Sequence, residues 1–214
     1  MNYPNGIKKE YKLSTSNRGM NLETDINETN IYYRDNNIAV IYKKPTPITI
    51  NKVDYKSRVD AIITEAHFKT PSTTDYNGVY KGMYIDFEAK ETRKEYFPLA
   101  NIHAHQIKHL NQIKDCGGIG FIIVRFVLKG ETYLLTIECL NDFLNTSKRK
   151  SIPIEYFKEK GYVIKEGFKP YLDYLKIIDD IRSDTNKWKK ITMLEKTTLK
   201  IKLIKMSKIM ELWN

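Results

Sequence analysis

The segment that most constrains the fold is residues 120–127, Gly-Phe-Ile-Ile-Val-Arg-Phe-Val, which is apolar at nearly every position. A strand of this kind is typical of the interior of a sheet that is buried on both faces. Residues 83–89 and 133–137 are expected to form further strands, and residues 101–115 a helix. Strands and a helix in this mixed order predict a single α/β domain around a mixed sheet.

Turn formers divide the rest of the chain into shorter elements. Pro45 and Pro47 would interrupt a sheet ladder, so we expect a turn or a sheet edge there. Residues 69–78 are dense in turn formers. The remaining expected elements are a helix over residues 18–30 with Ser16 or Asn17 as its N-cap, strands over 38–43, 46–54 and 61–68, and helices over 154–160 and 171–181.

The size and charge of the chain limit its partners. Its 214 residues are enough for one domain with a substantial core, and 41% hydrophobic residues are typical of a globular protein. The formal net charge is +10 at pH 7, which favours a polyanionic partner, most commonly nucleic acid. Anionic membranes and ribosomes also attract basic proteins, so the charge alone does not decide between them.

Cysteine usage and hydropathy exclude several classes of protein. Cys116 and Cys139 are too few for a disulfide framework and form no CxxC pair, which excludes a cysteine-rich zinc site. Residues 1–16 lack the apolar core of a signal peptide, and no stretch is apolar enough for a membrane-spanning helix. We therefore expect a cytoplasmic protein that binds no membrane.

The two ends of the chain differ in composition from its middle. Residues 1–16 carry three lysines and are expected to form a flexible basic arm, and residues 17–183 to form the folded domain. Residues 184–214 form a Lys-rich tail that we expect to be helical. The tail is interpreted either as a helix that packs one apolar face on the domain or as a basic segment that contacts DNA or a partner.

A pattern for phosphodiester hydrolysis lies in the middle of the chain. Asp75 is followed by twelve residues and then by Glu88-Ala89-Lys90. Two carboxylates are a usual ligand set for Mg²⁺, which neutralises developing charge and acidifies the attacking water. Lys90 lies two residues beyond Glu88, so both side chains leave the same face of a strand. Its ammonium is then placed to position the water or to stabilise the transition state.

This spacing is unspecific when taken alone, because a highly charged chain produces it by chance. The alternative interpretation is a solvated strand edge that carries a Glu–Lys pair. Three features favour the hydrolytic site: Asp75 lies in a turn-rich segment, the strand of Glu88 is apolar on its other face, and the whole protein is basic.

Longer motifs in the chain resemble those of a known family, the RecU family of Holliday-junction resolvases, which belongs to the PD-(D/E)XK nuclease superfamily. The matching segments occur in family order across about residues 3–181, and the Lys-rich tail has no counterpart. The segments are Asn-Arg-Gly-Met at 17–20, Lys-Lys-Pro-Thr-Pro-Ile at 43–48, the runs at 71–80 and 84–92, and the short motifs at 97–99, 105–107 and 151–153.

The resemblance implies both a fold and an activity. RecU-like proteins are homodimers that bind four-way DNA junctions and nick two strands of like polarity symmetrically with Mg²⁺, for which Mn²⁺ is the expected substitute. The implied fold is a restriction-endonuclease-like domain over residues 17–183 with a β stalk within residues 43–81. The implied roles are in homologous recombination and DNA repair, where a recombinase or a branch-migration protein is an expected partner.

The family's site residues are matched position by position. Asp75 and Glu88 match the metal-binding carboxylates, and Lys90 matches the group that stabilises the transition state. Thr73 and Gln106 match the remaining metal-site positions. Asp75 lacks the preceding proline of the superfamily's name, as RecU-like sequences generally do.

Other polar residues near these motifs are weaker candidates for a role in the active site. Glu23 matches a supporting acidic residue of related nucleases, and its alternative interpretation is a solvated helix residue. Asp86 shares the strand face of Glu88 and Lys90, so it is interpreted either as a group that supports the ligands from behind or as a surface residue, and not as a ligand itself. His103, His105 and His109 are expected to be structural or to face DNA, and a zinc site is the alternative.

Basic and aromatic residues alternate through the expected stalk. In the family, this region enters the centre of the junction, so we expect its aromatic rings to stack on bases and its lysines to meet phosphates. Phe68 is the expected wedge, and packing of its ring against the sheet is the alternative. The candidate DNA-binding residues are Lys43, Lys44, Arg58, Phe68, Lys69 and Lys81.

Two other functions remain open at this point. One is a junction-binding or strand-pairing protein that does not cleave, and the other is a sequence-specific endonuclease built on the same core. Cleavage of a branched substrate compared with a linear duplex distinguishes all three. In each case, binding is expected to weaken steeply with salt.

Overall fold

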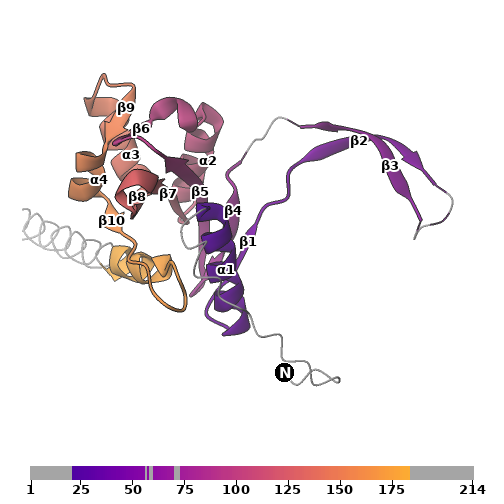
Figure 1. Ribbon diagram of the computed structural model, residues 1–214, viewed down its shortest axis with the longest axis horizontal. Helices are drawn as coiled ribbons and strands as arrows, with labels where there is room; N and C mark the ends of the chain where they lie inside the picture. The colour runs from indigo at the N-terminus through magenta and orange to yellow at the C-terminus, as the bar shows by residue number, and fades with distance from the viewer. Residues whose placement is uncertain (1–20, 56, 58–59, 70–72, 184–214) are drawn as a thin grey trace, which may run out of the picture.

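A six-stranded mixed sheet forms the centre of the computed structural model, which describes residues 21–183 apart from 56, 58–59 and 70–72 (Figure 1). β5 and β7 are parallel, and the other neighbouring strands are antiparallel. In spatial order the strands are β1 (Val40–Lys43), β4 (Tyr76–Tyr80), β5 (Met83–Thr92), β7 (Ile119–Phe126), β8 (Glu131–Thr136) and β10 (Tyr162–Val163).

Helices cover both faces of this sheet. One face packs on α1 (Leu22–Asp35) and on the helical residues 174–183. The other face packs on α2 (Ala104–Asp115), α3 (Ile137–Thr146) and α4 (Ile154–Lys160), beside the small sheet of β6 (Tyr96–Pro98) and β9 (Ser151–Pro153). None of the helices among the described residues is long and apolar enough to span a membrane.

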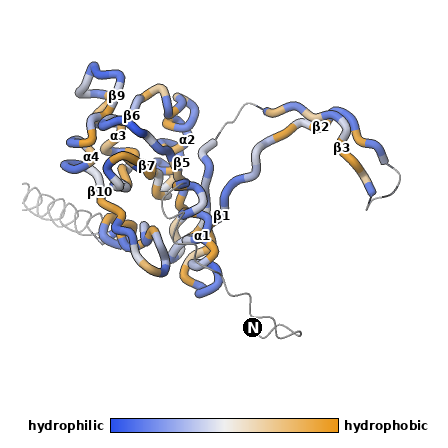
Figure 2. Tube along the Cα trace, viewed as in Figure 1, coloured by the Kyte–Doolittle hydropathy of each residue, from blue (hydrophilic) through white to orange (hydrophobic). Residues whose placement is uncertain are grey.

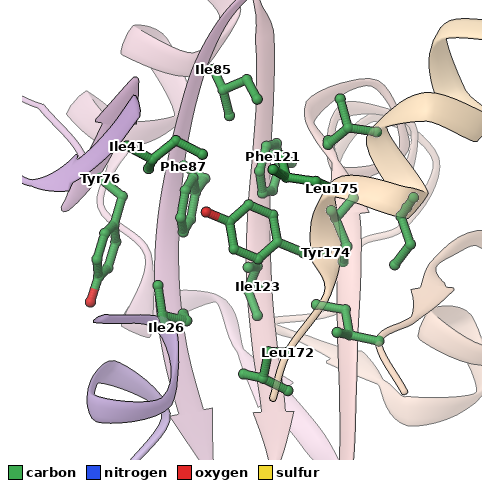
Figure 3. Close-up of a cluster of buried hydrophobic side chains, with 14 of the residues drawn as sticks. Ile26, Ile41, Tyr76, Ile85, Phe87, Phe121, Ile123, Leu172, Tyr174 and Leu175 are labelled. Atoms are coloured by element: carbon green, nitrogen blue, oxygen red, sulfur yellow. The ribbon is translucent and has the colours of Figure 1, made fainter. Parts of the chain in front are cut away.

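β7 lies at the centre of the sheet because it supplies apolar side chains to both cores. Phe121 and Ile123 belong to the core beneath α1, whereas Ile122 and Val124 belong to the core beneath α2. Figure 3 shows Phe121 beside Phe87 of β5, and the two rings stack with centroids 4.8 Å apart. The prediction that this run is buried on both faces is confirmed.

A β hairpin projects from the domain between β1 and β4. It consists of β2 (Ile48–Asp54) and β3 (Ile62–Phe68), which pair only with each other among the described residues. Every residue of both strands is exposed, and Figure 2 shows hydrophobic and hydrophilic residues interspersed along them. We call this hairpin the stalk. The predicted fold class, an α/β domain with a mixed sheet flanked by helices and a protruding β stalk, is confirmed.

Several element boundaries differ from the sequence predictions. The first helix begins at Leu22, because the side chain of Asn21 caps it by accepting a hydrogen bond from the backbone N of Glu23. It extends to Asp35 rather than ending at Asn30. β4 occupies part of the segment that was predicted to be turns, and α3, β6, β9 and β10 were not predicted. Ser16, Asn17, the basic arm and the Lys-rich tail lie outside the described residues.

Candidate active site

Glu88 and Lys90 lie on the face of β5 that is turned toward α2. Ile85 and Phe87 point into the opposite core, as the period of two in a strand requires. The Glu88 side chain is completely buried, and Nζ of Lys90 forms an ion pair with its Oε1. The predicted shared face of Glu88 and Lys90 is therefore present in the structure.

Asp75 reaches Glu88 because β4 is antiparallel to β5. Tyr76 lies opposite Phe87 in the ladder, so the residue before Tyr76 is placed at the level of Glu88. The backbone N of Asp75 donates a hydrogen bond of 3.1 Å to Oε2 of Glu88. The structure thus brings Asp75, Glu88 and Lys90 together at one end of the β4–β5 pair.

The surroundings of Glu88 disfavour its charged form. Burial raises the pKa of its carboxyl from 4.5 to about 7, the neighbouring charge of Asp75 adds to this, and Lys90 opposes it. A buried carboxyl group next to a second carboxyl group is a common feature of functional sites, since a bound cation relieves both effects.

The chemistry of these donors fits a hard divalent cation. Oε1 of Glu88 is buried and has no hydrogen-bond partner among the described residues, although Lys90 contacts it. Asp75 is partly exposed, so its carboxylate remains accessible from solvent. The described residues hold no group of three or more His, Cys, Asp or Glu side chains that would bind a metal. Neutral oxygens and water would therefore complete a Mg²⁺ shell around the two carboxylates.

Thr73 and Gln106 are the candidates for such neutral oxygens. Thr73 lies two residues before Asp75, and its hydroxyl is 3.5 Å from the backbone oxygen of Thr74. Gln106 is buried in the first turn of α2, where its Oε1 accepts a hydrogen bond of 2.9 Å from the backbone N of His103. An amide oxygen has two lone pairs, so this bond leaves one of them for a cation.

Glu23 lies in the first turn of α1, close to Tyr76, which follows Asp75 in the chain. Its backbone oxygen lies 3.5 Å from the Tyr76 hydroxyl, and its side chain forms an ion pair of 2.5 Å with Lys43. Burial raises the pKa of Tyr76, and the charges of Glu23, Asp75 and Glu88 add to this. Among the described contacts, the Glu23 side chain pairs with Lys43 rather than with Asp75 or Glu88, so its supporting role stays a prediction.

Comparison with known proteins decides the family of the chain. The family model described as Recombination protein U matches residues 17–180. The chain belongs to the RecU family. The protein named Holliday junction resolvase RecU from Geobacillus kaustophilus (strain HTA426) is 50% identical over an alignment 196 residues long, which covers 85% of this chain and 97% of that protein. The protein of the same name from Bacillus cereus (strain G9842) is 50% identical over 84% of this chain and 96% of its own length.

Among solved structures, the Holliday junction resolvase Hjc of Archaeoglobus fulgidus has a TM-score of 0.39 and 10% sequence identity. The match covers 64% of this chain and 96% of the Hjc chain.

At the stalk of this RecU-family chain, the two predicted DNA-binding residues that the structure describes, Phe68 and Lys69, are exposed. Phe68 is 82% exposed, which contradicts the alternative that its ring packs against the sheet. It pairs with Ile48 in the first rung of the hairpin, so it lies at the root of the stalk rather than at its tip. Lys69 follows it and is also exposed. Arg58 lies outside the described residues.

The other predicted DNA-binding lysines have carboxylate partners. Lys81 forms an ion pair of 2.8 Å with Asp179, and Lys43 pairs with Glu23. Both lysines remain about half exposed, so phosphate can compete for them. The Lys44 side chain is only 18% exposed and points inward.

Of the two interpretations of Asp86, the structure contradicts the surface residue. Its carboxylate is completely buried, and its partners are Lys44, Thr74, Tyr84 and His109. Alternation along β5 placed Asp86 on the face of Glu88, and that was the only available signal. The alternative zinc site has no support among the described residues, because His109 pairs with Asp86 and no metal-binding group of three is present.

Proposed function

We propose that this chain is a Holliday-junction resolvase, an endonuclease that nicks the phosphodiester backbone of four-way DNA junctions. The observation that carries the proposal is the meeting of Asp75, Glu88 and Lys90 in a chain of the RecU family. The relatives that are 50% identical carry the name Holliday junction resolvase RecU and are matched over almost their whole length.

The residues of the site have separate tasks in this reaction. The carboxylates of Asp75 and Glu88 would hold Mg²⁺, with Thr73 and Gln106 supplying neutral oxygens. When bound, the ion supplies neutralisation of the phosphate charge and acidification of the attacking water. Mn²⁺ is expected to replace it, since it accepts the same oxygen ligands.

Lys90 acts on the substrate side of the site. Its ammonium is held beside Glu88 and is about one-quarter exposed, so it is fixed in position yet accessible to a phosphate. A positioned cation stabilises the charge that develops on the phosphate in the transition state. Lys90 would also orient the attacking water through its remaining N–H groups.

Substitution of the carboxylates tests this assignment. Asp75→Asn and Glu88→Gln are expected to lower the rate of junction cleavage in Mg²⁺ by at least about 1000-fold, because each removes an anionic ligand of the cation. Binding of the same junction in Ca²⁺ should stay within about threefold, since phosphate contacts dominate affinity. Mapping the cuts at nucleotide resolution on a junction and on a linear duplex identifies the substrate.

Asp115→Asn is the matched control, because Asp115 is an exposed carboxylate at the end of α2. It should leave both cleavage and binding unchanged. Normal cleavage by either site variant would refute the assigned site. Cleavage of linear duplexes at one sequence would favour a sequence-specific endonuclease, and binding without cleavage by the unmodified protein would favour a non-cleaving junction binder.

We further propose that the protein acts as a homodimer, because two symmetric nicks are most simply made by two related active sites. Sedimentation equilibrium is the direct measurement. A monomer at micromolar concentration, with and without junction DNA, would contradict this part of the proposal.

A further inference from the structure

Both roots of the stalk are fastened to one buried carboxylate. The chain leaves the sheet for the stalk at Lys44, directly after β1, and it returns to the sheet at Thr74, just before β4. Lys44 and Thr74 contact Asp86 of β5, and His109 of α2 contacts it from the helix. We call these four residues the stalk-root cluster.

The contacts of the cluster form a closed network. Nζ of Lys44 donates to Oδ2 of Asp86 at 2.8 Å and to the Thr74 hydroxyl at 3.0 Å. The Thr74 hydroxyl in turn donates to Oδ1 of Asp86. His109 Nε2 lies 3.1 Å from Oδ2, and Tyr84 donates to the same oxygen at 3.1 Å. Both oxygens of a completely buried carboxylate are thus satisfied, which makes the network costly to break.

The close packing of α2 on the sheet brings His109 to this network. Asp86 lies opposite Gly120 in the parallel β5–β7 ladder. A Cβ atom at Gly120 would lie 2.8 Å from the backbone oxygen of Leu110, so the absence of a side chain lets α2 approach the sheet closely at this point. His109 is the neighbour of Leu110 and reaches Asp86 from there.

The cluster is joined to the candidate active site through the backbone of Asp75. The backbone N of Lys44 donates to the backbone oxygen of Asp75 at 2.7 Å. The backbone N of Asp75 donates to Oε2 of Glu88. Asp75 is therefore held on one side by Lys44 and on the other by Glu88, and its chain neighbour Thr74 is held by Asp86.

We propose that Lys44, Thr74 and His109 are positioning residues, which act through Asp86 to fix the stalk roots and thereby set Asp75 against Glu88. The inference rests on the proposed function, because it assumes that Asp75 and Glu88 are the catalytic carboxylates. It replaces the phosphate contact predicted for Lys44, whose ammonium is already engaged by Asp86 and Thr74. The stalk and the active site are then held by the same buried carboxylate. DNA that binds the stalk would therefore shift or fix the position of Asp75.

A split between binding and cleavage tests the role of Lys44. Lys44→Met keeps the length of the side chain and removes the ammonium. We expect the single-turnover cleavage rate at saturating protein to fall by up to about 100-fold, a loss that a misplacement of about 1 Å can cause. The junction Kd in Ca²⁺ should stay within about twofold, and the slope of log Kd against log salt should not change. A phosphate contact would instead lower that slope by about 0.9 with the cleavage rate kept.

Two more conservative variants at Thr74 test the same role. They keep the proposal testable if the Lys44→Met protein does not fold. Thr74→Val removes the hydroxyl at nearly constant volume, and Thr74→Ser retains it. Cleavage should fall about tenfold in Thr74→Val and recover in Thr74→Ser, with junction binding unchanged in both. Equal rates for Thr74→Val and the unmodified protein would overturn the proposal, as would a changed salt slope with normal cleavage in Lys44→Met.

Two comparisons complete the test. Lys176→Met is the control for charge, because Lys176 is exposed on the helix that covers the other face of the sheet. It should leave the cleavage rate unchanged. Lys44→Met combined with Asp86→Asn should be no slower than the slower single variant, because residues that act as one unit are not additive. Additive losses would contradict the shared anchor.

Glu88→Gln distinguishes the two proposals. If Glu88→Gln cleaves normally, the proposed active site fails. If Glu88→Gln is inactive while Lys44→Met and Thr74→Val cleave normally, only the positioning role fails.

Discussion

Glu88 and Asp86 are two buried carboxylates on one strand, and their surroundings give them opposite properties. Asp86 is surrounded by a lysine, a histidine and two hydroxyl groups. Glu88 has the single ammonium of Lys90 and the repelling charge of Asp75, so burial dominates and raises its pKa to about 7. Asp86, whose two oxygens are fully engaged by protein groups, positions the site, whereas Glu88, with fewer partners and a second carboxylate beside it, is suited to bind a cation.

The raised pKa of Glu88 predicts how stability depends on pH in the metal-free protein. The folded state binds a proton at Glu88 more tightly than the unfolded chain, whose carboxyl titrates near 4.5. Stability therefore falls as the pH rises from about 4.5 to about 7, and the cost is fully present above that range. Glu88→Gln should raise the free energy of unfolding at pH 8 by on the order of 1–3 kcal/mol.

Urea denaturation in EDTA at pH 5 and pH 8 measures this effect, with Asp115→Asn as the exposed control. The gain from Glu88→Gln should be larger at pH 8 than at pH 5. A gain that is equal at both values would contradict the raised pKa. Added Mg²⁺ should stabilise the unmodified protein more than Glu88→Gln, since a cation that binds only the folded state shifts the equilibrium toward it.

At the residue scale, the sequence carried enough information for part of the site. The alternation of a strand places Glu88 and Lys90 on one face without any knowledge of the fold. The same alternation allowed a supporting role for Asp86, but its partners Lys44, Thr74 and His109 could not be predicted, because they come from three separate segments. These residues come together only because β4 pairs with β5 and α2 packs closely on the sheet.

At the element scale, the sequence predicted β7 correctly and β4 incorrectly. The apolar run of β7 has only one environment that suits it, a sheet covered on both faces. In β4, Asn77 and Gly78 are turn formers, yet they lie in a strand between β1 and β5. A Cβ atom at Gly78 would lie 2.1 Å from the backbone oxygen of Val40, so this glycine serves close strand packing rather than a turn.

The close packing of α2 on β7 predicts that a side chain at Gly120 lowers stability and slows cleavage. Gly120→Ala should lower the free energy of unfolding by about 1–3 kcal/mol, because the new methyl group pushes against the backbone of Leu110. It should also slow cleavage, since the displaced helix carries His109 away from Asp86. Urea denaturation and single-turnover cleavage measure the two effects.

Gly130→Ala is the comparison for this prediction. Nothing lies within 4 Å of a Cβ atom at Gly130, whose φ is 63°, so the substitution costs only backbone strain of about 1 kcal/mol. It should leave cleavage unchanged. Normal cleavage by Gly120→Ala would mean that the close packing of α2 on β7 does not affect the active site.

At the scale of the whole molecule, a domain with buried apolar cores carries a hairpin whose strands are exposed. The domain buries its apolar residues in two cores, whereas the stalk leaves its apolar side chains exposed, Phe68 most of all. A two-stranded hairpin in water is marginally stable by itself. An exposed aromatic ring among basic residues is suited to stacking on unpaired bases, which a four-way junction offers at its centre and a linear duplex does not.

The last prediction therefore concerns the choice between branched and linear DNA. Phe68→Ala should weaken binding of a four-way junction in Ca²⁺ by about 5- to 150-fold, which corresponds to the loss of about 1–3 kcal/mol of base stacking. Binding of linear duplex and the free energy of unfolding should stay nearly unchanged, because the ring is 82% exposed. Phe168→Ala is the matched control, since Phe168 is 77% exposed and lies on the domain rather than on the stalk. If both variants bind the junction as tightly as the unmodified protein, recognition of the branch does not depend on this ring.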